Sequence, residues 1–263
     1  MFEIGLLNVI FIAFVSGAVG TTIGGTLGIL VKKPNKTYIA SMLAFAAGAM
    51  LGMALFEMAP ESAQYGGIIP LLVGLGLGAS FVYGFDLLFH KKTKDALKYN
   101  HLEINISFKE GEAVLEKRKL FKVGLAVFFA IILHDLPEGI AIGAGYHMGI
   151  GLLIGLVMLL HNIPEGLSIA VPLKAAGVKN FKIILIAFLA GIPTVLGAII
   201  GYFLGANEML ISYTLAFAAG AMIYVVFSEL LPMAYDYSKK NNLTTLLVII
   251  GAVMIMVFAY LLH

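Results

Sequence analysis

Residues 134–139 read His-Asp-Leu-Pro-Glu-Gly, and residues 161–166 read His-Asn-Ile-Pro-Glu-Gly. Each hexapeptide lies in the middle of an apolar run that is long enough to cross a lipid bilayer. A carboxylate at the bilayer centre costs roughly 2.5–3.5 kcal/mol on insertion scales, so both need something that neutralises them. The two runs therefore predict membrane helices that meet at a buried polar site.

The composition is that of a polytopic membrane protein. Of the 263 residues, 60% are hydrophobic and only 12% are charged, and the mean hydropathy is +0.99. A soluble domain of this length needs far more polar surface. There is no cysteine, so any metal must be bound by nitrogen and oxygen ligands. A net charge of +2 gives no indication of nucleic-acid binding, and no nucleic-acid partner is expected.

The apolar runs predict an all-α fold of eight transmembrane helices. They cover about residues 4–31, 37–60, 67–90, 122–146, 149–172, 180–205, 208–235 and 242–262. The single long connection, residues 91–121, is expected to be a cytoplasmic loop. A small hairpin around residues 102–112 and a solvated basic loop are the two alternatives for it.

The basic residues predict the orientation in the cell membrane. All 17 Lys and Arg residues lie in or beside the first, third, fifth and seventh connections, around residues 32–36, 91–122, 174–182 and 239–240. The other connections and both termini have none. By the positive-inside rule, the basic connections are cytoplasmic and both termini are extracytoplasmic.

The chain contains an internal repeat. Residues 44–50 read Ala-Phe-Ala-Ala-Gly-Ala-Met and recur as residues 216–222, and the same offset of 172 takes Glu57 to Glu229. The first and sixth helices each carry a doubled small-xxx-small face, at Gly20, Gly24 and Gly28 and at Gly197, Gly201 and Gly205. With the two hexapeptides as the centre, this predicts a 3+2+3 plan of inverted repeats, in which sites lie near the midplane at the repeat interface.

The hexapeptides carry the chemistry of a divalent metal site. The His and Glu of each are four residues apart, which places them on one helix face. Two such faces offer two imidazoles and two carboxylates, and the residue after each His adds oxygens for a second subsite. The candidate metal-binding residues are His134, Asp135, Glu138, His161, Asn162 and Glu165.

Two other interpretations of the hexapeptides remain open, a satisfied polar pair in a helix bundle and a proton relay. Given this topology, Glu57 is expected near the outer end of the second helix and Glu229 near the cytoplasmic end of the seventh, as entrance and exit stations on a transport path. The alternative for these two carboxylates is an interfacial position that faces headgroup water.

On these residues, the chain resembles the ZIP family of divalent metal transporters, in its prokaryotic zinc-uptake branch. The resemblance covers the whole chain and implies uptake of Zn²⁺, with Fe²⁺, Mn²⁺, Co²⁺ or Cd²⁺, into the cytoplasm. It implies one metal position at the two His and two Glu residues, and a second at Asp135, Asn162 and the same Glu residues. It also implies that homodimers can form, and that helices 1, 4, 5 and 6 move against helices 2, 3, 7 and 8.

The chain departs from this resemblance on its sixth helix. Many relatives carry a Glu there that completes the second metal position, and Thr194 takes its place in this chain. The departure predicts that the second position is weak or empty.

An intramembrane metal-dependent hydrolase, whose zinc activates a water, is the alternative function. The near-equivalence of the two halves favours transport, because a single catalytic centre has no need of inverted symmetry. We therefore expect a transporter and not an enzyme, with the metal as its cargo and not as a catalytic cofactor.

Overall fold

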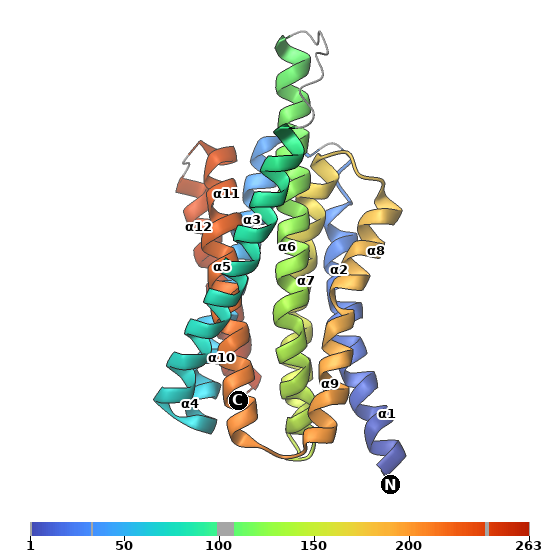
Figure 1. The fold of residues 1–263 in the computed structure, drawn as a ribbon, viewed down its shortest axis with the longest axis vertical. Helices are drawn as coiled ribbons and strands as arrows, with labels where there is room; N and C mark the ends of the chain where they lie inside the picture. Colours follow the sequence, from blue (N-terminus) through green and yellow to red (C-terminus); the bar gives the residue numbers. More distant parts are fainter. Residues whose placement is uncertain (1, 33, 99–107, 240–241, 263) are drawn as a thin grey trace.

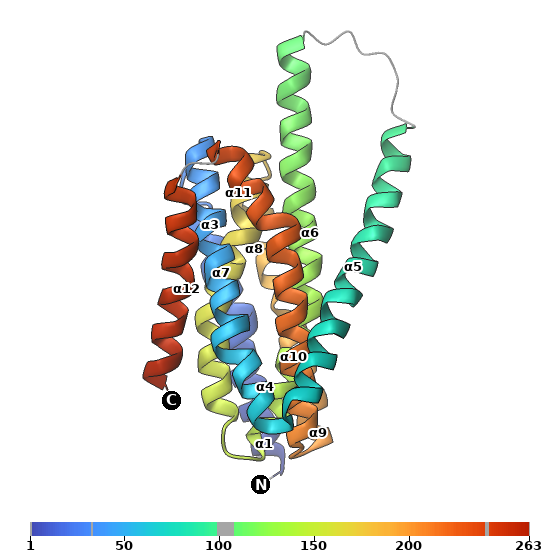
Figure 2. The ribbon, with the colours of Figure 1, turned by 90° about the vertical axis from the view of Figure 1, so that its left-hand side faces the viewer.

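The computed structural model is a bundle of long helices that run roughly along one direction (Figures 1 and 2). It describes residues 2–32, 34–98, 108–239 and 242–262. Within these ranges there are eight helical segments long and apolar enough to cross a membrane. This confirms the predicted all-α, eight-helix class, and the chain is a multi-pass membrane protein.

Spans one and six are each built from more than one helical segment. Span one joins α1 (Phe2–Ala13), the π-helical segment η1 (Phe14–Val19) and α2 (Gly20–Gly28); span six joins α8 (Asn180–Ala190) and α9 (Ile192–Leu204). Four spans consist of a single helix: α5 (Ile68–Lys98), α6 (Phe108–Tyr146), α7 (Gly151–Ala175) and α12 (Asn242–Leu262).

Spans two and seven share one plan, in which a helix passes through a π-helical segment into a short helix whose second residue is proline. Span two is α3 (Lys36–Met53), η2 (Ala54–Met58) and α4 (Ala59–Gly66); span seven is α10 (Glu208–Val225), η3 (Val226–Leu230) and α11 (Leu231–Ser238). The bounds of all three segments match at the sequence offset of 172. Asn35 and Asn207 cap the two spans in the same way, because each side chain accepts a backbone N–H three residues on.

The helices pack in corresponding pairs. In the outer part of the bundle, α3 packs on α12 and α10 packs on α5. Around the centre, α2 packs on α7 and α9 packs on α6, and α6 lies against α7. The 3+2+3 inverted-repeat arrangement stays a prediction, and these matched pairs support it.

Glycine allows the central helices to touch through their backbones. A Cβ on Gly24 would lie 1.9 Å from the carbonyl oxygen of Ile163, and a Cβ on Gly197 would lie 2.1 Å from that of Leu136. Such distances leave no room for any side chain. Gly205 has a different role, because it ends α9 with a φ of 75°, a conformation that glycine adopts at little cost.

The connection between spans three and four differs from the predicted loop over residues 91–121. Residues 91–98 continue α5 and residues 108–121 begin α6, while residues 99–107, which include most of the alternative hairpin, lie outside the described residues. The last part of that alternative hairpin, residues 109–112, is helical, and this stretch of α6 is rich in helix-forming Glu, Lys, Arg, Ala and Leu. Ion pairs Lys36–Glu116 (3.1 Å) and Lys119–Asp236 (2.7 Å) join it to α3 and α11.

The two ends of the bundle differ. The start of α1 and the end of α12 lie at the end opposite the start of α6, which extends beyond the rest of the bundle in Figure 2. The starts of α3 and α8 and the end of α11 lie near the α5–α6 end in Figure 1. We call this end the basic end, because all four Lys- and Arg-bearing connections lie there, and the other end the termini end.

Candidate metal site

The two hexapeptides lie on the central helices α6 and α7 and are completely buried. We call six residues the buried cluster, and each of them has 0% exposure: His134, Asp135, Glu138, His161, Asn162 and Glu165. Charged and polar groups are almost never fully buried without compensation. The structure therefore gathers all six predicted residues in one protected region.

Each histidine of the buried cluster contacts the glutamate of the other helix. Nε2 of His134 lies 2.8 Å from Oε1 of Glu165, and Nε2 of His161 lies 3.1 Å from Oε2 of Glu138. The sequence predicts that the His and Glu of one hexapeptide lie on the same helix face. Because α6 packs against α7, the histidine on each of these faces contacts the glutamate on the other. The two helices are thus joined by crossed imidazole–carboxylate contacts.

Four residues of the buried cluster offer ligand atoms close enough to bind one ion. One atom each from His134, Asp135, Glu138 and Glu165 lies within 4.8 Å of the others. His134 also lies 3.6 Å from Oδ1 of Asp135. Three carboxylates and an imidazole form a donor set that suits Zn²⁺, Fe²⁺ or Mn²⁺.

Two predicted ligands have a different position. His161 lies outside this group of four and reaches it through Glu138. Asn162 turns its amide toward span one, where Nδ2 donates to the carbonyl oxygen of Ser16 at 2.8 Å. Asp135 and Asn162, which the sequence placed together in a second position, therefore have separate partners.

Unpaired polar atoms distinguish this cluster from a satisfied polar pair. Among the described residues, six buried side-chain nitrogen or oxygen atoms have no hydrogen-bond partner, and five of these belong to the buried cluster: His134 Nδ1, Asp135 Oδ1, Glu138 Oε1, Asn162 Oδ1 and Glu165 Oε2. A buried polar group without a partner costs about 1–3 kcal/mol. A cation among these atoms would compensate for this cost.

Glu57 and Glu229 lie outside the buried cluster, at matching positions in η2 and η3. Glu57 is 3% exposed and lies toward the termini end, whereas Glu229 is half-buried and lies toward the basic end.

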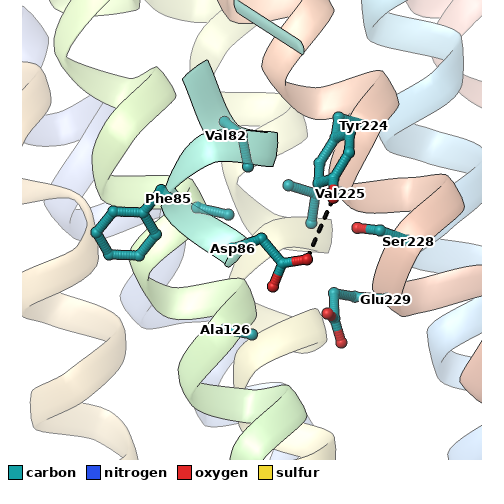
Figure 3. Close-up of a pocket in the computed structure, with 9 residues that line it drawn as sticks. Val82, Phe85, Asp86, Ala126, Tyr224, Val225, Ser228 and Glu229 are labelled. Atoms are coloured by element: carbon teal, nitrogen blue, oxygen red, sulfur yellow. Dashed lines mark hydrogen bonds between the residues drawn. The ribbon is translucent and has the colours of Figure 1, made fainter. Parts of the chain in front are cut away.

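A cavity between α5, α6 and the α10–η3 segment surrounds Glu229 (Figure 3). Asp86 on α5 points toward Glu229, and Tyr224 donates a hydrogen bond to Asp86 at 3.2 Å. Ala126 and Ala130 of α6 form another wall, one and two turns before His134 on the same helix face. The sequence analysis did not single out Tyr224 and Ser228, which also line this cavity. Their spacing of four residues, which is typical of one helix face, could have indicated that they lie together.

The fold and this site define a class of protein, a polytopic membrane protein with a buried central group of side chains that could bind a metal ion. The family described as ZIP Zinc transporter matches residues 89–259. The chain belongs to this family; it is a divalent metal transporter and not an enzyme.

Curated relatives extend the match to most of the chain. A protein named zinc transporter ZupT from Chlorobium limicola is 35% identical over 237 residues, which cover 85% of this chain and 86% of the relative. The zinc transporters ZupT of Clostridium perfringens and Escherichia coli are 30% and 31% identical, with coverage of 88% and 90% of both chains. The alternative of an intramembrane hydrolase is thereby set aside.

Proposed function

We propose that this protein carries Zn²⁺ into the cytoplasm through a site formed by the buried cluster between α6 and α7. The observation that carries the proposal is the set of unpaired nitrogen and oxygen atoms in a fully buried region, where ligand atoms of four residues lie within 4.8 Å of one another. Three carboxylates there repel one another, and a dication offsets this repulsion. Zinc is the first choice because the relatives are named zinc transporters.

The donor set supports a wider range of cargo than zinc alone. Imidazole and carboxylate ligands suit several divalent metals, and there is no thiolate to favour a soft ion. Fe²⁺, Mn²⁺, Co²⁺ and Cd²⁺ are therefore proposed as further cargo. The same site serves binding and release, so ligand exchange must be reversible on the time scale of transport.

The proposed path runs from the termini end, past Glu57, to the buried cluster and then past Glu229. The cavity on the basic side supports the second half, since Ala130 lies about 6 Å from His134 along α6 at 1.5 Å per residue. The distribution of Lys and Arg supports a cytoplasmic basic end and extracytoplasmic termini. Together these features support the proposed inward direction.

Zinc flux into proteoliposomes tests this function. Glu138→Ala and His161→Ala are expected to lower the uptake rate at limiting zinc by at least about tenfold, since even the partners of metal ligands change affinity 10–100-fold. Glu138→Gln keeps the shape of the side chain and is expected to fail in the same way. Uptake is followed with a zinc indicator trapped inside the vesicles.

Glu208→Ala is the matched control, because Glu208 is exposed in the first turn of α10 and far from the buried cluster in the chain. Its uptake rate should equal that of the unmutated protein. If Glu138→Gln and His161→Ala elute as folded protein and still transport zinc at the unmutated rate, the site assignment is wrong. If the unmutated protein shows no zinc flux, the proposed cargo is wrong.

A further inference from the structure

Thr194 of α9 is hydrogen-bonded to a carboxylate of the buried cluster. Its Oγ1 donates to Oδ2 of Asp135 at 3.2 Å, and both residues have 0% exposure. The other carboxylate oxygen, Oδ1, lies 3.6 Å from Nε2 of His134 and has no hydrogen-bond partner. The Asp135 carboxylate therefore has one oxygen bound to the threonine and one that faces the ligand atoms.

Glycine contacts fix Thr194 in place. A Cβ on Gly139 would lie 2.0 Å from the carbonyl oxygen of Thr194, so α6 and α9 touch through their backbones. A Cβ on Gly17 would lie 2.6 Å from the Thr194 hydroxyl oxygen, so η1 closes the other side. With close contacts on both sides, the hydroxyl has little freedom to leave Asp135.

The other half of the bundle contains a threonine at the corresponding contact, but it has a different partner. A Cβ on Gly166 would lie 2.1 Å from the carbonyl oxygen of Thr21, just as a Cβ on Gly139 would lie 2.0 Å from the carbonyl oxygen of Thr194. The Thr21 hydroxyl donates to the Gly17 carbonyl oxygen of its own span at 2.9 Å. Of these two threonines, Thr194 is thus the one whose hydroxyl donates a hydrogen bond to the buried cluster.

We infer that Thr194 is a positioning residue for the transported metal, because it orients Asp135 so that the free Oδ1 joins His134, Glu138 and Glu165 as a fourth ligand of a single ion. This inference rests on the proposed metal site and adds the residue that sets its affinity. Hydrogen bonds to ligating carboxylates are a general way in which proteins orient metal ligands. Without the hydroxyl, Asp135 can rotate away from the group of four.

The test compares Thr194→Val with Thr194→Ser and Thr21→Val, in zinc binding and in zinc flux. Thr194→Val removes the hydroxyl and is expected to weaken zinc binding by about 10–100-fold, the usual effect of losing a partner of a metal ligand. The KM for zinc rises correspondingly and the maximal rate changes little. Binding is measured by calorimetry on detergent-solubilised protein and flux in proteoliposomes.

Thr194→Ser keeps the donor and should bind zinc as the unmutated protein does. Thr21→Val removes an equally buried hydroxyl that does not touch the buried cluster, and it should also leave zinc affinity unchanged. Equal weakening by both valine variants, or unchanged affinity in Thr194→Val, would overturn the inference. Failure of the proposed function is distinguishable, because it shows in the unmutated protein as binding without flux or as no binding.

Discussion

Gly139, which directly follows Glu138 of the buried cluster in the chain, meets Thr194 where α6 crosses α9. The hydrogen atom of glycine lets the two backbones approach, and this approach brings the Thr194 hydroxyl to Asp135. The position of a candidate ligand is therefore set by a residue that has no side chain. A similar backbone approach occurs between Gly166 and Thr21 in the other half, but the Thr21 hydroxyl donates to the Gly17 carbonyl oxygen.

Gly139→Ala is expected to destabilise the protein by about 1–3 kcal/mol or more, because its Cβ would overlap a backbone carbonyl that cannot rotate away. Gly76→Ala is the matched control, since a Cβ there meets nothing within 4 Å and alanine is the better helix former. The thermal midpoint in detergent, followed by circular dichroism, should fall for Gly139→Ala and stay or rise for Gly76→Ala. Equal midpoints for the two variants would contradict the close contact.

At the scale of elements, the matching π-helical segments η2 and η3 place one glutamate on each side of the buried cluster. The two sides differ in their surroundings. Glu57 is buried, whereas Glu229 lines the cavity formed with Asp86 and the small side chains Ala126 and Ala130. Small residues on one face of α6 thus leave space on the basic side of the buried cluster.

Ala130→Leu tests whether this space is the path to the basic end. Ala130 is 4% exposed and lines the cavity, so a leucine side chain would fill the space one turn from His134. We expect a severalfold lower maximal zinc flux, while zinc affinity in detergent is unchanged because no ligand is altered. Ala130→Ser, which is similar in size to the native residue, should transport normally. Normal flux in a folded Ala130→Leu protein would place the path elsewhere.

At the scale of the whole molecule, the basic connections and the termini lie at opposite ends of the bundle. This follows from eight crossings, and the Lys and Arg distribution predicts that the basic end is cytoplasmic. The absence of cysteine from the chain makes the orientation directly measurable, because a single introduced thiol is the only one present.

Ala206→Cys, in the α9–α10 connection, and Lys179→Cys, in the α7–α8 connection, test the orientation. Both positions are exposed and lie at opposite ends. A membrane-impermeant maleimide added to intact cells should label Ala206→Cys and leave Lys179→Cys unlabelled until the membrane is permeabilised. The reverse labelling pattern would contradict the proposed topology and, with it, the proposed direction of transport.

The sequence by itself determined the class, the eight spans and the six residues of the buried cluster, because lipid imposes long apolar runs and makes every polar group within them exceptional. It did not show that residues 91–98 and 108–121 are helical, because lipid imposes no helical structure outside the apolar runs and the ion pairs of Glu116 and Lys119 with α3 and α11 are tertiary contacts.

Only the tertiary structure decided which partner each polar atom has. In it, each imidazole contacts the glutamate carboxylate of the other helix, Asn162 donates to the Ser16 carbonyl oxygen, and Thr194 donates to Asp135. These contacts depend on the distance and rotation between packed helices. A spacing of four residues in the sequence determines which side chains share a helix face. The close glycine contacts between helices determine which side chains of the neighbouring helix that face contacts.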